Sequence, residues 1–209
     1  MLVLAIVISY FLGAIPIGYI LSRVLKGIDI RKYGSGNIGA TNVFRVVSPL
    51  AGLVVLLLDM LKGLIPVVVL GDVLLQWMPA YDHVFIRILL GIAAVCGHNW
   101  TIFLQFKGGK GIATTAGVLL GLSIKVHSLG IIVLLCLLVW IAVVFITRYV
   151  SLGSIAAACV FPILMIVFGQ PVKLVLFAVA LGLFAVYRHK SNIYKLLRGE
   201  EHKISLKKG

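Results

Sequence analysis

The sequence predicts an all-α polytopic membrane protein with seven transmembrane helices. The first observation is composition, because 62% of the 209 residues are hydrophobic, only 12% are charged and the mean hydropathy is +1.17. A soluble domain is about 45–50% apolar and about 25% charged, and its core could not hide this much apolar surface. The second observation is the order of the apolar runs, and the third is the distribution of basic residues between them.

Seven apolar runs follow one another, and a membrane helix needs roughly 17–25 residues. The runs cover residues 2–25, 50–71, 85–104, 112–124, 129–147, 151–169 and 171–187. The first run lacks the basic start and the small-residue cleavage site of a secretory signal, so we expect a retained helix. The fourth run is short for a full span, and the sequence leaves open whether it is tilted or partly re-entrant.

The basic residues are distributed unequally between the two ends of these runs. With the N-terminus outside, the inside loops and tail hold five, two, one and seven Lys or Arg residues, 15 in all, against three at the outside ends. Because Lys and Arg are enriched on the cytoplasmic side, this orientation predicts an outside N-terminus and a cytoplasmic C-terminus. No linker or repeat interrupts the pattern, so we expect one integral membrane domain over residues 1–209.

The same distribution argues against two other classes of protein. The net charge of +13 lies in short clusters between apolar runs, which is not the continuous basic face of a nucleic-acid binder. Cys96, Cys136 and Cys159 lie inside apolar runs without zinc or redox spacing. We therefore expect no disulfide, no metal site and no nucleic acid partner.

The first inside loop, residues 33–45, alternates glycines with hydroxyl and amide side chains and ends at Arg45. Glycine lets backbone N–H groups approach an anion closely, and an arginine fork matches a phosphate. A flexible turn between two helices is the alternative, but such a turn requires no row of donors beside an arginine. The loop therefore predicts a phosphate site.

The second inside loop, residues 97–114, contains Lys-Gly-Gly-Lys-Gly directly before an expected helix start near Ile112. A helix N-terminus offers unpaired N–H groups and the positive end of the helix dipole. ATP binding is not indicated, because Lys110 is followed by Gly111 rather than by Ser or Thr. The alternative to a phosphate site is that the lysines only anchor the loop at lipid headgroups. His98, at the start of this loop, is a general base, a group that orients its neighbours by a hydrogen bond, or a packed residue without a role in the site.

Three further features carry polar side chains. The basic segment 187–202 is either part of the site or an anchor at the headgroups. Ser154 could face the interior of the helix bundle. Asp59 and Lys62 share one helix face within the second run, as a functional group or as a structural ion pair.

Together, these loops resemble the bacterial acyl-phosphate:glycerol-3-phosphate acyltransferases, the PlsY family. The resemblance rests on Ser-Gly-Asn-x-Gly-Ala-Thr-Asn-x-x-Arg at 35–45, on Gly-His…Phe-Lys-Gly-Gly-Lys-Gly-x-Ala-Thr at 97–114, and on His-x-x-Asn-Ile…Gly-x-Glu at 189–201. Gly-x-Ile-Pro-x-Gly at 13–18 and Asp-x-x-Lys-Gly at 59–63 fit as well, so the match covers nearly the whole chain. Thr101 stands where the family usually has proline.

The resemblance implies an enzyme of phospholipid biosynthesis in the cytoplasmic (inner) membrane of a bacterium. Its members transfer a fatty acyl chain from acyl phosphate to the sn-1 hydroxyl of glycerol 3-phosphate, giving 1-acylglycerol 3-phosphate (lysophosphatidate) and inorganic phosphate. The expected partners are glycerol 3-phosphate, long-chain acyl phosphate and membrane lipids, and no cofactor is expected. The expected catalytic residues are Ser35, Arg45, His98, Lys110 and Asn192. The expected substrate-binding residues are Gly36, Asn37, Gly39, Thr41, Asn42, Lys107, Gly108, Gly109, Gly111, Ser154, Arg188 and Glu201.

Two other functions are alternatives to this one. A transporter or channel for a small phosphorylated anion would also use glycine-broken helices and cationic groups. Such a protein should carry its cations near the midplane, whereas the phosphate-type loops here collect on one face. An acyltransferase of the His-x-x-x-x-Asp type is excluded, because no histidine has aspartate five positions later.

Overall fold

The computed structural model describes residues 1–204 and makes them all-helical, as the sequence predicts. Within these residues, five helical segments are long and apolar enough to cross a membrane, or six if the bent pair at the C-terminal end is one span. The segment Ile112–Lys125 is apolar but shorter. The chain divides into two compact units at His127 and Ser128, and each unit is described separately.

The first span of the first unit is broken. The sequence predicts one helix over 2–25, but α1 (Leu2–Ala14) and α2 (Ile17–Lys26) are separated at Ile15 and Pro16. Proline lacks an N–H group and disfavours helical geometry in the preceding residue, and Ile15 accordingly has ψ 116°. The break corrects the prediction of a continuous helix.

The second span continues further than the sequence indicated. Helix α4 (Pro49–Ile65) passes through a π-helical turn, η2 (Pro66–Leu70), into α5 (Gly71–Trp77). The sequence placed an outside loop from residue 71, but the helix ends only at Trp77. Asp72 is compatible with this helix because Arg87 and Lys125 pair with its carboxylate at 2.5 and 2.6 Å.

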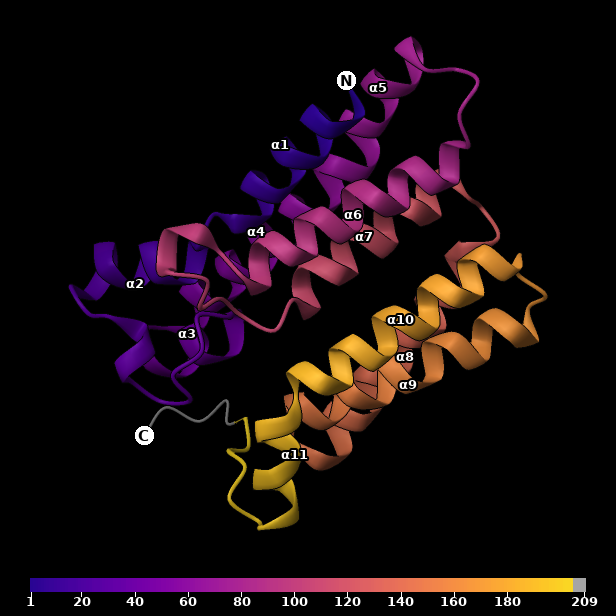
Figure 1. The fold of residues 1–209 in the computed structure, drawn as a ribbon. Helices are drawn as coiled ribbons and strands as arrows, with labels where there is room; N and C mark the ends of the chain where they lie inside the picture. Colours follow the sequence, from indigo (N-terminus) through magenta and orange to yellow (C-terminus); the bar gives the residue numbers. More distant parts are fainter. Residues whose placement is uncertain (205–209) are drawn as a thin grey trace. The chain divides into compact units, whose positions relative to one another are not determined.

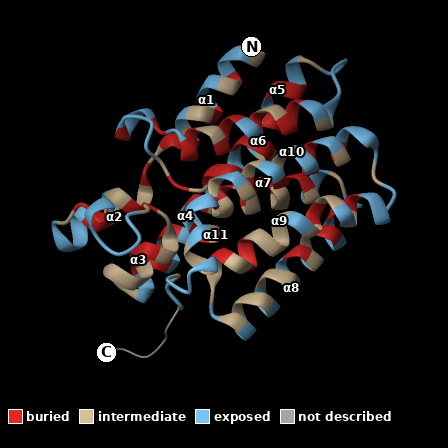
Figure 2. Cartoon of the chain, turned by 60° about the horizontal axis from the view of Figure 1, so that its bottom comes forward, coloured by how far each residue is buried: buried red, intermediate tan, exposed pale blue. Residues whose placement is uncertain are grey.

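Helix α6 (His83–Asn99), with the short η3 (Ile102–Leu104) after it, is the most buried span among the described residues. It packs against α1, while α4 packs against α7 (Ile112–Lys125). Both contacts depend on glycine, since a Cβ atom on Gly13 would lie 2.0 Å from the Ala94 oxygen and one on Gly117 would lie 1.8 Å from the Met60 oxygen. Small residues allow close backbone approach where lipid provides no hydrophobic driving force. Figure 2 shows the buried residues along α6.

Among the described residues of the second unit, the long helices α8, α9 and α10 are followed by the shorter α11 (Figure 1). Helix α9 (Val150–Val167) packs against both α8 (Leu129–Thr147) and α10 (Val172–Arg188). The chain then bends by 57° into α11 (Lys190–Leu197). The helices α8 to α10 confirm the predicted runs 129–147, 151–169 and 171–187 to within two residues.

Candidate active site

The first glycine loop lies between α2 and α3 (Ala40–Val46), with a turn of 3-10 helix, η1 (Ile30–Lys32), near its start. The buried Asn42 side chain holds this loop together. Its Nδ2 group donates to the carbonyl oxygens of Tyr33 at 3.0 Å and Asn37 at 2.9 Å, and its Oδ1 accepts from the Ser35 N–H group at 2.9 Å. Asn42, which the sequence suggested as a substrate contact, is therefore a residue that shapes the loop.

The exposed part of this loop is the turn around Ser35. Gly34 has φ +57°, and a Cβ atom there would lie 2.3 Å from the Asn42 Oδ1 atom, so both conformation and space require glycine. Asn37 accepts a hydrogen bond from the Gly39 N–H group at 2.8 Å and supports the turn from its other side. These contacts leave the Ser35 hydroxyl on the surface, while Arg45 is half-buried in the last turn of α3.

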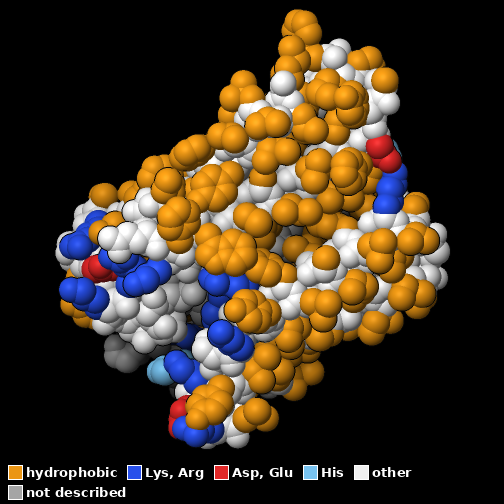
Figure 3. All heavy atoms as spheres, in the orientation of Figure 1, with side chains coloured by type: hydrophobic (Ala, Val, Ile, Leu, Met, Phe, Trp, Pro, Cys, Tyr) orange, Lys and Arg blue, Asp and Glu red, His pale blue; other side chains and the backbone are white. Residues whose placement is uncertain are grey.

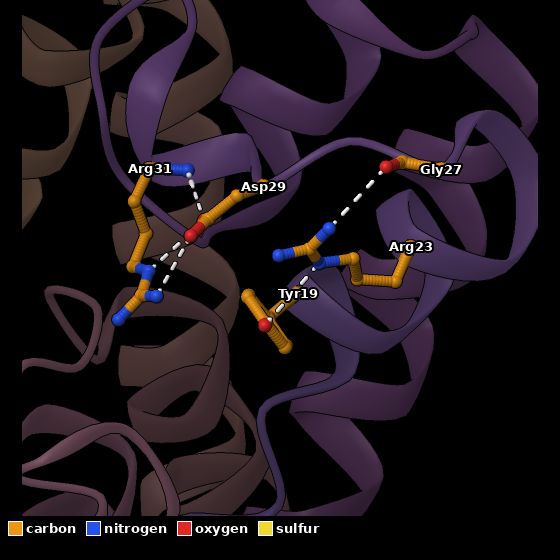
Figure 4. A network of polar contacts seen from close by, with 5 residues as sticks. All are labelled: Tyr19, Arg23, Gly27, Asp29 and Arg31. Carbon is orange, nitrogen blue, oxygen red and sulfur yellow. Dashed lines mark hydrogen bonds and ion pairs between the residues drawn. The ribbon is translucent and has the colours of Figure 1, made fainter.

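A second polar network holds the base of the same loop (Figure 4). The Arg31 guanidinium donates to both oxygens of the Asp29 carboxylate at 2.9 and 2.7 Å. These hydrogen bonds lower the pKa of Asp29 from 3.8 to about 2, so the carboxylate is charged across the physiological range. The guanidinium groups of Arg31 and Arg23 lie 5.1 and 5.5 Å from the centre of the Tyr19 ring. The start of the loop is thus fastened to α2.

The second glycine loop lies directly on the end of α6. The N–H groups of Gly108 and Gly109 donate to the carbonyl oxygens of Asn99 and His98, both at 3.1 Å. A Cβ atom on Gly109 would lie 2.1 Å from the His98 Nε2 atom, so no other residue fits without displacing the ring. His98 is buried and touches this loop, which places it as a support for the loop.

The loop ends at the N-terminus of α7. Gly111 precedes that helix with φ +81°, and no side chain caps the first turn. The N–H groups of this turn and the positive end of its dipole have the character of an anion site, and the site that the sequence predicted here stays a prediction. Lys107 is exposed and Lys110 is half-buried beside it. Thr114, in the same turn, is fully buried, and its hydroxyl has no hydrogen-bond partner within the described residues.

Both loops are tied to the break between α1 and α2. Gly18, at the start of α2, is so close to the first loop that a Cβ atom would lie 1.9 Å from the Ile38 oxygen. The Thr101 hydroxyl, at the start of the second loop, donates to the Ala14 oxygen at 2.5 Å. Sequence reasoning noted Thr101 only as a departure from the family pattern, and its buried hydrogen bond now gives it a structural role.

The electrostatic character of the first unit follows from the same arrangement. Figure 3 shows Lys and Arg side chains gathered over α2 and the loop that follows it, whereas hydrophobic side chains cover α1. A cationic end beside an apolar wall suits a molecule with both a phosphate group and an acyl chain.

In the second unit, the polar residues lie where α10 bends into α11. His189 is buried at the bend, and its Nδ1 atom lies 2.7 Å from the Ala185 oxygen. A carbonyl can only accept, so Nδ1 carries a proton and a neutral ring presents Nε2 as an acceptor. Sequence reasoning quoted this histidine within a motif but did not select it. Its burial at a helix bend, one residue after Arg188, makes it a further candidate.

Asn192 and Glu201 form one hydrogen-bonded group in this unit. The Glu201 Oε1 atom accepts from Asn192 Nδ2 at 2.9 Å and from the Ser151 hydroxyl at 3.0 Å. Glu201 thereby fastens the segment after α11 to α9 and fixes the Asn192 amide. Ser154, a suggested substrate contact, donates to the Val150 oxygen at 2.9 Å and accepts from Trp140 Nε1 at 3.3 Å. The bond to Val150 lies within α9 and the bond from Trp140 joins α8 to α9, while the suggested substrate contact of Ser154 stays a prediction.

The comparisons with known proteins agree on one family. A family model described as glycerol-3-phosphate acyltransferase matches residues 3–199. A glycerol-3-phosphate acyltransferase 2 from Moorella thermoacetica is 45% identical over 204 residues, which is 98% of each chain. A glycerol-3-phosphate acyltransferase from Desulforamulus reducens is 44% identical over 207 residues, covering 99% of this chain and 96% of its own.

Solved structures give the same result for the fold. A crystal structure of PlsY, an integral membrane glycerol 3-phosphate acyltransferase, in its glycerol 3-phosphate form superposes with a TM-score of 0.84 at 36% identity, covering 98% of this chain and 96% of that one. The lysophosphatidic acid form gives 0.81 at 35% identity, covering 98% and 95%. The family model spans nearly the whole chain, and the two glycine loops and the bend at His189 fall within it, so the chain belongs to the glycerol-3-phosphate acyltransferase family.

Proposed function

We propose that this protein transfers a fatty acyl chain from acyl phosphate to the sn-1 hydroxyl of glycerol 3-phosphate. The observation that carries the proposal is the pair of glycine loops that flank the α1–α2 break, one with Arg45 and an exposed Ser35 hydroxyl, the other with an uncapped helix start and two lysines. Family membership supports it, because relatives are named glycerol-3-phosphate acyltransferases and a solved relative exists in glycerol 3-phosphate and lysophosphatidic acid forms.

The reaction suits a site of this kind. The sn-1 oxygen of glycerol 3-phosphate attacks the carbonyl carbon of the acyl phosphate, the bond between that carbon and the phosphate oxygen breaks, and the hydroxyl proton passes to the phosphate groups. The products are 1-acylglycerol 3-phosphate and inorganic phosphate. Phosphate is a good leaving group, so holding two anions in position and stabilising charge on the carbonyl oxygen supply much of the catalysis.

We assign roles to the residues of the first unit from their exposure and chemistry. Arg45 and Lys110 neutralise phosphate charge, and Lys107 assists from the exposed side of its loop. The Ser35 hydroxyl donates a hydrogen bond to substrate. Asn42 and His98 hold the loops in place.

In the second unit, we assign the roles that the resemblance implies. Arg188, Asn192 and Glu201 keep their substrate-directed roles, with Glu201 acting through Asn192.

We also propose a topology. The chain crosses the cytoplasmic membrane of a bacterium seven times as one acyltransferase domain, with α7 as its shortest span, the N-terminus outside and both glycine loops in the cytoplasm. Support comes from the 15 basic residues on the inside ends against three on the outside ends. It also comes from the helical segments found at each predicted run and from a family model that covers both units.

The acyl donor is the feature of this proposal that is easiest to test. Purified full-length protein would receive glycerol 3-phosphate with palmitoyl phosphate, palmitoyl-CoA or palmitoyl-acyl carrier protein, and mass spectrometry would identify the product. We expect 1-palmitoylglycerol 3-phosphate from palmitoyl phosphate alone, because the helix start at α7 and the lysines beside it fit a phosphate leaving group. Equal or faster reaction with a thioester donor would contradict the proposal.

A further inference from the structure

A buried ion pair lies on α4, within the second span. The Lys62 Nζ atom and the Asp59 Oδ1 atom are 2.8 Å apart, and the two residues are only 6% and 2% exposed. Charges within a membrane span are costly and mark functional positions. Replacing a buried pair by apolar residues of similar volume is often neutral or stabilising. A contribution to stability alone is therefore a weak explanation for the presence of this ion pair.

Lys62 connects the pair to the first glycine loop. Its Nζ atom donates to the Ile15 oxygen at 3.0 Å, at the break between α1 and α2. The residues that follow the break lead to Gly18, which packs against the Ile38 carbonyl group in the loop. Lys62 thus fixes the point from which α2 reaches the first loop.

Asp59 connects the pair to the second glycine loop. Its Oδ1 atom lies 3.8 Å from the His98 Nδ1 atom, which is an ion pair when the ring is protonated. The opposite ring atom, Nε2, faces Gly109 so closely that a Cβ atom there would lie 2.1 Å away. The His98 ring therefore lies between Asp59 and the loop, and its position decides where Gly109 lies.

We propose that Asp59 and Lys62 are positioning residues for the acyl transfer, because together they fix the two glycine loops relative to each other through His98 and Ile15. A reaction between two anionic substrates depends on their separation, and a misplacement of about 1 Å can lower its rate about a hundredfold. The kinetic consequence rests on the proposed function. The inference that the ion pair holds both loops in place is independent of that function.

Asp72 offers a matched control within the same span. Like Asp59, it is an aspartate that pairs with basic side chains, Arg87 at 2.5 Å and Lys125 at 2.6 Å, although its own side chain is 42% exposed. It lies on α5, beyond the π-helical turn, and its ion pairs involve α6 and α7 at the ends away from the glycine loops. Loss of the Asp72 charge disturbs an ion pair without releasing either loop.

The test compares Asp59→Asn with Asp72→Asn in the full-length protein in detergent. Hydrogen exchange read by mass spectrometry would follow residues 34–39 and 107–111, and steady-state kinetics would use palmitoyl phosphate and glycerol 3-phosphate. We expect faster exchange in both loops and a fall in kcat/KM of about tenfold or more for D59N. For D72N we expect exchange and kcat/KM within about twofold of wild type. Unchanged loop exchange in D59N, or the same change in D72N, would overturn the proposal.

One double variant separates positioning from folding. If D59N alone does not fold, Asp59→Asn with Lys62→Met removes both charges and leaves none uncompensated. We expect the double variant to unfold at the wild-type midpoint. Its loop exchange should still be fast and its kcat/KM still lowered, as in D59N. A double variant with wild-type exchange and kinetics would overturn the proposal.

His98→Gln tests whether Asp59 acts through the ring. We expect D59N to speed hydrogen exchange in residues 107–111 by no more than about twofold further when added to H98Q, since residues in one chain of contacts are not additive. Fully multiplicative effects would contradict that route. A wild-type protein with no acyltransferase activity would remove the proposed function, and the hydrogen-exchange comparison would still decide whether the pair holds the loops.

Discussion

Asn42 and Arg45 lie three residues apart on α3 and serve the first glycine loop in different ways. Asn42 is buried and uses its amide within the loop, so its effect on substrate is indirect. Arg45 is half-buried and carries the charge that a phosphate requires. Sequence reasoning expected Arg45 to be catalytic and Asn42 to bind substrate, and only the burial of the Asn42 amide shows how that side chain is used within the loop.

The role assigned to Arg45 leads to a prediction for glycerol 3-phosphate binding. Arg45→Ala should raise the Michaelis constant for glycerol 3-phosphate, because a charge-assisted hydrogen bond contributes about 1.5–3 kcal/mol, or about ten- to a hundredfold. Lys32→Ala removes an exposed cation from the start of the same loop and should change that constant by less than about twofold. Steady-state kinetics of both variants make the comparison. Wild-type kinetics in R45A would refute the assignment.

At the scale of elements, the packing of α4 on α7 places the second loop. Gly117 of α7 lies against the Met60 carbonyl group, with room for no Cβ atom. Gly63, one turn further along α4, touches the Thr114 oxygen in the same way. The helix whose N-terminus is the proposed anion site is thereby fixed by backbone contacts with the helix that carries the buried ion pair.

A substitution at Gly117 measures this packing. Gly117→Ala should lower the free energy of unfolding by about 1–3 kcal/mol, because the added methyl group overpacks the contact. Gly130→Ala is the matched control, since nothing lies within 4 Å of a Cβ atom there and alanine favours the helix by roughly 0.5–1 kcal/mol. Thermal unfolding in detergent, followed by circular dichroism, should show a lower midpoint for G117A only. Equal midpoints for the two variants would show that α4 and α7 are not packed this closely.

The elements also show what the sequence could predict. Hydropathy located the apolar helices well, because each consists of residues that only lipid or another helix can cover. It missed the break at Pro16, since the surrounding residues are as apolar as a continuous span, and it missed α5, because Asp72 reads as a loop residue until Arg87 and Lys125 are seen beside it.

The candidate site was predictable to a similar degree. The glycine loops were found from composition and spacing, but the distinction between contact and support depends on burial. Burial and partners show how three of these side chains are used: His98, Asn42 and Glu201. The His98 ring, for example, lies against Gly109. His189 was part of the third motif but was not selected as a site residue, because the sequence does not show that the bend buries it.

At the scale of the whole molecule, the protein combines apolar spans with cationic glycine loops. In the proposed function, the spans accommodate the acyl chain of the donor, and the loops of the first unit supply donors for phosphate. A transporter of phosphorylated anions shares some of these features, but it would move its substrate without changing it. The two functions therefore differ in chemistry, because only the acyltransferase releases inorganic phosphate from its acyl donor.

The most direct test measures inorganic phosphate released by the purified wild-type protein in detergent. Palmitoyl phosphate and glycerol 3-phosphate would be supplied together and then one at a time, with lysophosphatidate measured in the same samples. We predict release only when both substrates are present, with one lysophosphatidate formed for each phosphate, because the bond to phosphate breaks as the ester forms. No release from well-folded protein, or release that does not depend on glycerol 3-phosphate, would contradict the assignment of this chain as an acyl-phosphate-dependent acyltransferase.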